Sequence, residues 1–300
     1  MDKKFLKRII NDCSLNDFIE DENASKKHEV FDKYLEKFTS FLYSNENQLI
    51  EHFWSEYIAL SEVATLQSSP LLRRYFIFLD CATAVYNYVA EKSKQKSGSE
   101  LSEHISIQLQ NDLRQFKGIL LLAINGCLNS VITEYRTMYE SFVIGQYLVL
   151  HPDLVSIYKE HSQFLRYHLT RLVGNSKPEW DKVYEDYIEK YGKEFTENYG
   201  WTKDVIQKKK DRIIGTLVKE CELDTSLVTL YKYSCSYVHS STFSVSTRPD
   251  LNSLKVFFQA TMYFILQEIL SYMQEIGLSE KEIIILDNIL MILYEDFKNI

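Results

Sequence analysis

Glycine and proline are scarce along the whole chain, with 9 glycines and 4 prolines among 300 residues. Globular proteins use about 7% glycine and about 5% proline. A β-sandwich needs a turn about every 8–12 residues, and a doubly wound α/β fold needs glycine at its turns. The chain has too few of these residues for either architecture. We therefore expect an all-α protein built as a multi-helix bundle.

The expected helices fall into an N-terminal region and a bundle core. Apolar residues at helical spacing predict three helices in the first region, near 31–42, 46–66 and 70–91. The stretch Lys92–Glu100 then mixes lysines with small polar residues, which is typical of a linker. We place a boundary there, with residues 1–95 as a helical extension and residues 96–300 as the core that carries the candidate site.

An uncharged stretch of 16 residues, Gly118–Thr133, lies within an almost continuous helical pattern from 101 to 150. A membrane-spanning helix needs about 20 predominantly apolar residues. The stretch is shorter and contains two asparagines, so we expect a helix buried in the protein core.

The second half of the chain alternates helical patterns with polar breaks. We expect an irregular, aromatic segment over 176–205. One helix is predicted before this segment and ends near Val173. Three helices are predicted after it, over about 224–240, 251–276 and 280–298. Asp224 or Thr225 is suited to cap the helix over 224–240, and Ser279 with Glu282 forms a capping box for the last helix.

Charge and cysteine content restrict the classes of function. The net charge is −8, which argues against a protein that coats nucleic acid broadly but leaves room for a local basic site. The five cysteines contain no Cys-x-x-Cys pair, and the N-terminus lacks the continuous apolar segment of a signal peptide. We expect a cytoplasmic protein with reduced cysteines. Signatures of nucleotide-binding loops and zinc peptidases are absent, so we expect no cofactor and no metal.

The first stretch that carries chemistry contains Arg136, Tyr139 and Glu140 in an apolar helix. Arg136 and Glu140 are four residues apart and share a helix face. Because burying an unpaired charge is costly, we expect them to pair with each other or across the core. Two interpretations stay open: an internal ion pair that fixes helix register, or a polar cluster at the base of a pocket.

The second stretch runs from Tyr231 through Lys232 to Ser241. Ser236 and His239 are three residues apart, so a helix would place them on one face. A histidine among hydroxyl groups can keep a near-neutral pKa, which suits a general acid or base. The alternative is a core histidine bonded to Ser236 or to a carbonyl. Arg166, on the helix before Val173, either joins Glu140 or is a solvated charge.

These positions resemble a bacterial all-helical family of unknown function over residues 101–275. The family carries an arginine and a Tyr-Glu pair on an apolar helix, followed by a later Tyr-x4-Ser-x2-His-x-Ser/Thr turn. The matching residues here are Arg136, Tyr139, Glu140, Tyr231, Ser236, His239 and Ser241. The family's name implies no activity.

The chain also resembles, more distantly, the HEPN superfamily of helical ribonuclease effectors in toxin and phage-defence systems. That signature is an arginine, then four to six residues, then a histidine, whereas here a lysine, Lys232, stands seven positions before His239 and no arginine is in range. Lysine lacks the planar fork of arginine, so Arg136 or Arg166 would have to supply it.

The resemblance implies metal-independent RNA cleavage within a HEPN-like core, in a homodimer. The catalytic residues would be His239, Ser236, Arg136 and Glu140. The substrate-binding residues would be Tyr139, Arg166, Tyr231, Lys232, Lys208, Lys209 and Lys210, the last three of which are alternatively a solvated face. The alternative function is a non-catalytic sensor or scaffold that binds a small anion or a protein partner, with no membrane contact.

Overall fold

The regular elements in the described part of the chain are all helical, as the scarcity of glycine and proline predicts. The computed structural model describes residues 69–96, 98–174, 177–238 and 253–298, together with residues 40, 44 and 249. The helices predicted over 31–42 and 46–66 lie outside the described residues, apart from the single positions 40 and 44. None of the described helices is long and apolar enough to cross a membrane.

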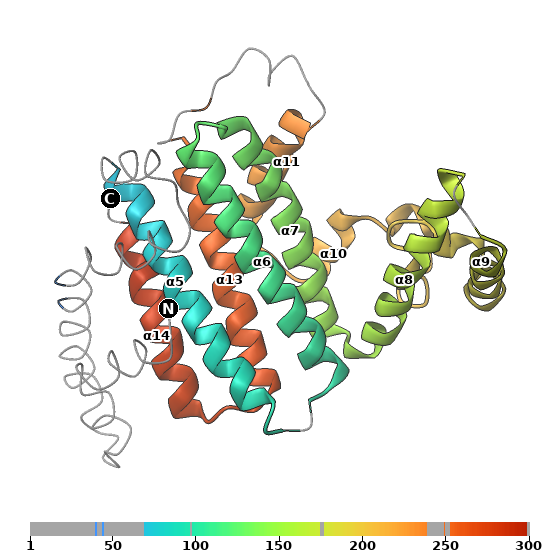
Figure 1. The fold of residues 1–300 in the computed structure, drawn as a ribbon, viewed down its shortest axis with the longest axis horizontal. Helices are drawn as coiled ribbons and strands as arrows, with labels where there is room; N and C mark the ends of the chain where they lie inside the picture. Colours follow the sequence, from blue (N-terminus) through green and yellow to red (C-terminus); the bar gives the residue numbers. More distant parts are fainter. Residues whose placement is uncertain are drawn as a thin grey trace.

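Five long helices run side by side and form the bundle (Figure 1). They are α5 (Pro70–Ser93), α6 (Glu100–Ile124), α7 (Leu128–Leu150), α13 (Lys255–Glu275) and α14 (Glu280–Lys298). Helix α13 is the central one, because it packs against each of the other four. Its sequence is apolar on nearly all sides, which is the pattern of a helix enclosed by a core.

Helix α5 shares this core with the helices that follow it. Ser69 caps its first turn and Pro70 occupies the first helical position, where the missing N–H costs nothing. The helix then packs against α6, α13 and α14. The boundary predicted near residue 95 therefore falls between two adjacent helices of one bundle.

The uncharged stretch 118–133 contains a tight turn between α6 and α7, so the expectation of one buried helix through it is wrong. Helix α6 ends at Ile124, and Gly126 adopts a positive φ of 71°. A left-handed backbone of this kind favours glycine because other residues carry a Cβ that clashes. The exposed Asn125 bonds its own helix end, with Nδ2 donating to the carbonyl of Leu121 at 2.9 Å.

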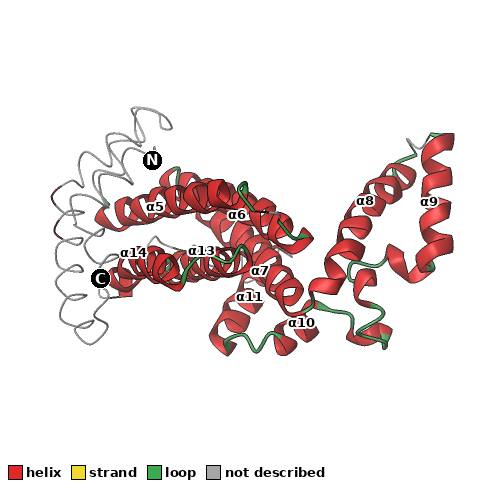
Figure 2. Cartoon of the chain, turned by 90° about the horizontal axis from the view of Figure 1, so that it is seen from below, coloured by secondary structure: helices red, strands yellow, loops and turns green. Residues whose placement is uncertain are grey.

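An arm projects from the bundle between α7 and α11 (Figures 1 and 2). Its helices are η2 (Pro152–Leu154), α8 (Val155–Leu172), α9 (Pro178–Tyr191), η3 (Lys193–Thr196), η4 (Gly200–Thr202) and η5 (Lys209–Asp211). Helix α10 (Ile214–Glu220) returns the chain to the bundle and packs against α7. The prediction of an irregular segment over 176–205 is wrong for α9. Pro178 begins this helix, acidic residues occupy its first turn, and Gly192 with φ of 81° ends it.

The last predicted helices are confirmed. Helix α11 (Thr225–Val238) packs against α7 and begins after Asp224, whose Oδ1 accepts from the backbone N–H of Ser226 at 2.7 Å. The capping box of α14 is present, because Ser279 Oγ donates to Glu282 Oε2 at 2.7 Å while the N–H of Glu282 donates back to Ser279 Oγ.

Candidate functional site

The candidate site begins with an ion pair on α7. Arg136 Nε lies 3.0 Å from Glu140 Oε1, as their four-residue spacing predicts. The two side chains are 23% and 32% exposed, so the pair is partly open to solvent and not sealed in the core. An arginine held this way keeps a fixed orientation and stays within reach of a ligand.

Helix α11 closes this pair through Tyr231. Its hydroxyl donates to Glu140 Oε1 at 2.9 Å, and its ring lies 5.7 Å below the guanidinium of Arg136. The ring also stacks on Tyr139 with centroids 4.7 Å apart. We call Arg136, Tyr139, Glu140 and Tyr231 the Arg136 cluster. The structure thus joins two stretches that are more than 90 positions apart in sequence.

Protonation states in the Arg136 cluster follow from burial and from the ion pair. Burial, with the hydrogen bond to Glu140 next, raises the pKa of Tyr231, so its hydroxyl stays a neutral donor. Partial burial disfavours the charged form of Arg136, but Glu140, Tyr231 and Cys235 outweigh this and raise its pKa. The cluster therefore contains one permanent cation and its counter-ion.

The arm reaches the Arg136 cluster through Tyr199, which sequence reasoning did not single out. Burial raises the pKa of Tyr199 to about 12, with Glu140 raising it further and Arg136 lowering it. This mutual influence places Tyr199 in the electrostatic neighbourhood of the pair. The residue lies between η3 and η4, so the arm contributes to the surroundings of the site.

Ser236 and Lys232 lie on α11, the helix of Tyr231, but on other sides of it. Ser236 Oγ donates to the carbonyl of Tyr233 at 2.7 Å, and Lys232 is exposed. At about 100° per residue, Ser236 lies about 140° around α11 from Tyr231. Cys235 is only about 40° away from Tyr231 by the same count and therefore lies on the same side of α11. His239 follows the end of α11 and lies outside the described residues.

Among the described residues, the predicted basic residues form no hydrogen bond or ion pair with the Arg136 cluster. Arg166 is exposed on α8, and within the described residues Glu140 binds Arg136 and Tyr231 instead. Lys208 and Lys210 are exposed, whereas Lys209 pairs with Glu197 at 2.5 Å. The three lysines thus belong to the arm, at and just before η5.

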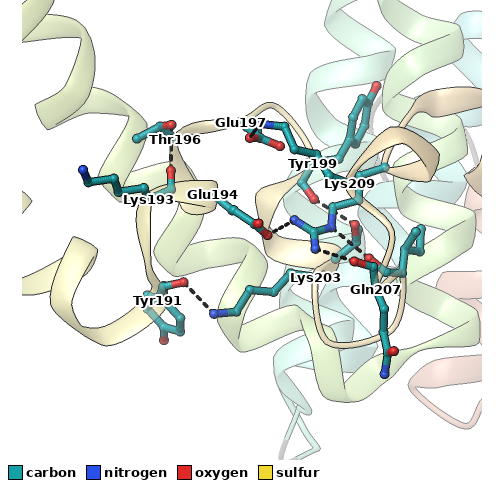
Figure 3. A network of polar contacts seen from close by, with 12 residues as sticks. Tyr191, Lys193, Glu194, Thr196, Glu197, Tyr199, Lys203, Gln207 and Lys209 are labelled. Carbon is teal, nitrogen blue, oxygen red and sulfur yellow. Dashed lines mark hydrogen bonds and ion pairs between the residues drawn. The ribbon is translucent and has the colours of Figure 1, made fainter.

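The arm loop around these lysines is held by a buried arginine (Figure 3). Arg212 is 8% exposed and binds the carboxylate of Glu194. It also donates to the carbonyls of Ile206 at 2.8 Å and Gln207 at 3.0 Å. The sequence does not mark Arg212 as buried, because one-dimensional spacing does not distinguish a buried guanidinium from a solvated one.

A second polar cluster, which the sequence analysis missed, lies inside the bundle. Asp112 of α6 and Glu268 of α13 are 2% and 3% exposed. The only signal in the sequence is a polar residue every fourth position on α6, at 104, 108 and 112, and a lone Glu268 in an apolar helix. Among the residues that the structure describes, no group of three or more His, Cys, Asp or Glu side chains is placed to hold a metal ion.

Comparison with known proteins gives one match. Neither the curated proteins nor the solved structures contain a match to this chain. Residues 104–252 match the Family of unknown function (DUF5677), and this range lies within the 101–275 expected from the sequence motifs. It contains the whole Arg136 cluster, Ser236 and His239. The central half of the chain, from α6 to the segment after α11, therefore belongs to this family of unknown function.

Proposed function

We propose that the Arg136 cluster binds a phosphate group of RNA and that His239 cleaves the adjacent phosphodiester bond without a metal ion. The observation that carries the proposal is the position of Tyr231. This residue closes the Arg136–Glu140 pair from α11, the helix that leads directly to His239. The helix that fixes the orientation of the cation is thereby the one that the histidine follows in the chain.

Arg136 has the geometry and chemistry of a phosphate ligand. Its Nε is bound by Glu140 and its plane lies over the ring of Tyr231, so the guanidinium loses little freedom when a ligand binds. Its side chain is 23% exposed. Guanidinium groups match phosphate oxygens with a planar fork, which the ammonium group of Lys232 cannot do.

The proposed reaction is an in-line displacement within the RNA chain. His239 takes the proton of the 2′-hydroxyl, and the 2′ oxygen attacks phosphorus. The O2′–P bond forms as the P–O5′ bond breaks, and the departing 5′ oxygen takes a proton from water. Arg136 stabilises the charge that develops on the phosphate oxygens. The products carry a 2′,3′-cyclic phosphate and a 5′-hydroxyl.

We expect a homodimer to be the working form. Lys208 and Lys210 would attract RNA to the arm through their positive charges. Steering by exposed lysines weakens with salt, because ions screen charges beyond about 8 Å at physiological ionic strength. RNA binding that is insensitive to salt contradicts this part of the proposal.

A second candidate is a non-catalytic sensor or scaffold, and one observation favours it. Glu140 places a carboxylate next to the arginine, so a polyanion such as RNA meets repulsion as well as attraction. In this case the Arg136 cluster fixes α11 on α7 and binds a small anion or a protein partner.

The test compares purified wild type with four variants on end-labelled RNA: Arg136→Ala, Arg136→Lys, His239→Ala and Arg114→Ala. Arg114 is an exposed arginine of α6 outside the cluster and serves as the matched control. We expect wild type and Arg114→Ala to release fragments with 2′,3′-cyclic phosphate ends. We expect His239→Ala to bind RNA without cleaving it, and Arg136→Lys to bind it more weakly than wild type.

Two outcomes separate the candidates. Cleavage by His239→Ala at the wild-type rate, or no cleavage by wild type, rules out the catalytic proposal. A lowered melting temperature of Arg136→Ala with unchanged RNA binding supports the scaffold.

A further inference from the structure

The polar cluster inside the bundle is built on one face of α6. His104, Gln108 and Asp112 follow one another at four-residue intervals and face the neighbouring helices. Asp112 lies opposite Glu268 of α13, and both are almost completely buried. The pair takes no part in the proposed reaction, although Ser141, which bonds Asp112, follows directly after Glu140 of the Arg136 cluster on α7.

Neutral donors bind one oxygen of each carboxyl group. Ser141 Oγ of α7 donates to Asp112 Oδ2 at 3.0 Å, and Gln108 Nε2 donates to Glu268 Oε1 at 3.0 Å. Gln108 Nε2 also donates to the backbone carbonyl of Ser141 at 2.8 Å. The second oxygen of Glu268, Oε2, is buried, and within the described chain no amide, hydroxyl or amine donates to it.

The carboxyl groups of Glu268 and Asp112 are neighbours in the core. The two carboxyl groups are close enough to hydrogen bond to each other. Two ionised carboxylates within hydrogen-bonding reach repel each other, and neither has a hydrogen to donate. A single proton on the pair makes one carboxyl group the donor and the other the acceptor. The unsatisfied oxygen is thus explained if the pair carries a proton.

The surroundings contain no cation that would take the place of this proton. Among the described residues, no lysine or arginine pairs with or hydrogen bonds to Asp112 or Glu268. The other titratable groups near the pair are His104 on α6 and Tyr158 on α8. Burial lowers the pKa of His104 and raises the pKa of Tyr158, so both are neutral at pH 7. The nearby group on α7 is the hydroxyl of Ser141.

We propose that Asp112 and Glu268 share one proton at neutral pH, and that loss of this proton as the pH rises weakens the packing of α6 on α13. The bundle then contains a built-in acid pair that makes its stability depend on pH. The inference is independent of the proposed RNA cleavage, because it concerns the core and not the Arg136 cluster.

The direction of the pH dependence follows from the pKa shifts. Burial raises the pKa of Asp112 to about 6, with hydrogen bonds from Glu268, Ser141 and Gln108 acting against it. Burial and then the charge of Asp112 raise the pKa of Glu268 well above its ordinary value. In the unfolded chain both groups titrate near pH 4. Above that pH the folded state binds more protons, so stability falls as the pH rises towards the folded pKa values.

Denaturant unfolding between pH 5 and pH 9 tests the inference on wild type, Glu268→Gln, Asp112→Asn and Glu185→Gln. Glu185 is an exposed carboxylate of α9, so its variant removes a charge without touching the pair. We expect the folding equilibrium constant of wild type to fall by up to about tenfold per pH unit where one proton is released. Glu268→Gln should flatten this dependence and be more stable than wild type at pH 8, because its neutral amide donates to Asp112. Glu185→Gln should keep the wild-type slope.

Infrared spectroscopy of wild type gives a second measurement that does not need a folded variant. We expect the carbonyl band of a protonated carboxyl group at pH 7, lost when the protein unfolds. Absence of this band, or a wild-type slope retained by both Glu268→Gln and Asp112→Asn, overturns the proposal. Stabilisation at pH 8 by magnesium chloride in wild type but not in Glu268→Gln overturns it as well, because a cation would then neutralise the pair.

Discussion

A single hydroxyl group joins the two halves of the candidate site. Tyr231 donates to Glu140 and stacks on Tyr139, so it links α11 to α7 by a polar and an apolar contact. The partner Glu140 is charged, and hydrogen bonds to charged groups are stronger than those between neutral groups. The orientation of Arg136 thus depends on a residue 95 positions further along the chain.

Replacing Tyr231 by Phe should remove the hydrogen bond while keeping the stacked ring. We expect a loss of about 1 kcal/mol in the free energy of unfolding, at the low end for a bond to a charged group because Glu140 is partly exposed. Urea denaturation at pH 7 measures the change. Tyr233→Phe is the control, because its hydroxyl bonds the neutral hydroxyl of Tyr237 at 3.0 Å. Equal losses in the two variants contradict the assigned role of Glu140.

At the scale of helices, α6 and α7 approach closely where Gly145 faces Gln108. A Cβ built on Gly145 would lie 2.8 Å from Cδ of Gln108, whereas a Cβ on Gly118 of α6 meets nothing within 4 Å. Both glycines stand inside helices, where alanine is intrinsically preferred by about 0.5–1 kcal/mol. The two positions therefore differ in packing and not in helix propensity.

Gly145→Ala should destabilise the protein by about 2 kcal/mol, because it displaces the buried amide of Gln108 from Glu268 and Ser141. Gly118→Ala should stabilise it by about 0.5 kcal/mol. Thermal unfolding of the two variants beside wild type gives the comparison. If Gly145→Ala melts at or above the wild-type temperature, Gln108 is not fixed in the position described here.

Helix α14 is anchored on α5 by one carboxylate. Glu282 caps its own helix through Ser279, accepts from Tyr88 at 3.0 Å and pairs with Lys92 at 3.2 Å. Partial burial alone would raise the pKa of Glu282, but these hydrogen bonds lower it to about 2. A depressed carboxyl pKa stabilises the folded state above the unfolded pKa near 4.3, and this contribution is lost as the pH falls towards 2.

Glu282→Gln should cost about 1 kcal/mol at pH 7, because the side chain is partly solvated and glutamine retains some capping. The difference from wild type should shrink as the pH falls from 5 to about 2. Glu280→Gln, an exposed carboxylate of the same first turn, is the matched control and should show a much smaller difference. A deficit in Glu282→Gln that does not change with pH contradicts the ionic anchor.

At the scale of the whole molecule, the arm is joined to the bundle by aromatic contacts and held in shape by Arg212. Trp201 of η4 lies edge-on to Tyr147 of α7 and Tyr158 of α8, with centroids 5.9 and 5.0 Å away. Arg212 binds Glu194 and two carbonyls and so ties the arm loop together (Figure 3). The arm thus keeps Tyr199 near the Arg136 cluster.

Arg212→Ala should open the arm while the bundle stays folded. Removing a buried guanidinium leaves two carbonyls and Glu194 without their partner, which costs roughly 3 kcal/mol. Hydrogen–deuterium exchange should rise in peptides covering 193–212 and stay at wild-type levels in α5 and α13. Uniform exchange changes along the chain contradict a separate role of this network.

The sequence predicted the fold better than it predicted the site. The capping box at Ser279 and the helix after Asp224 were predicted because caps depend on neighbours within four residues. The turn at Gly126 was missed because its surroundings are as apolar as a continuous helix. Arg136 and Glu140 were paired correctly by spacing, whereas Tyr199 and the Asp112–Glu268 pair were missed because their partners come from other helices.

The sequence alone determined the class of structure and the composition of its helices. Few glycines and prolines, apolar residues at helical spacing and local caps are properties of short segments, so they can be read without knowing the fold. The tertiary structure decided which charges are buried, which helices meet at Gly145, and that Tyr231 closes the Arg136–Glu140 pair. Burial and distance depend on residues brought together from remote parts of the chain, and helix spacing contains no information about which helix lies opposite.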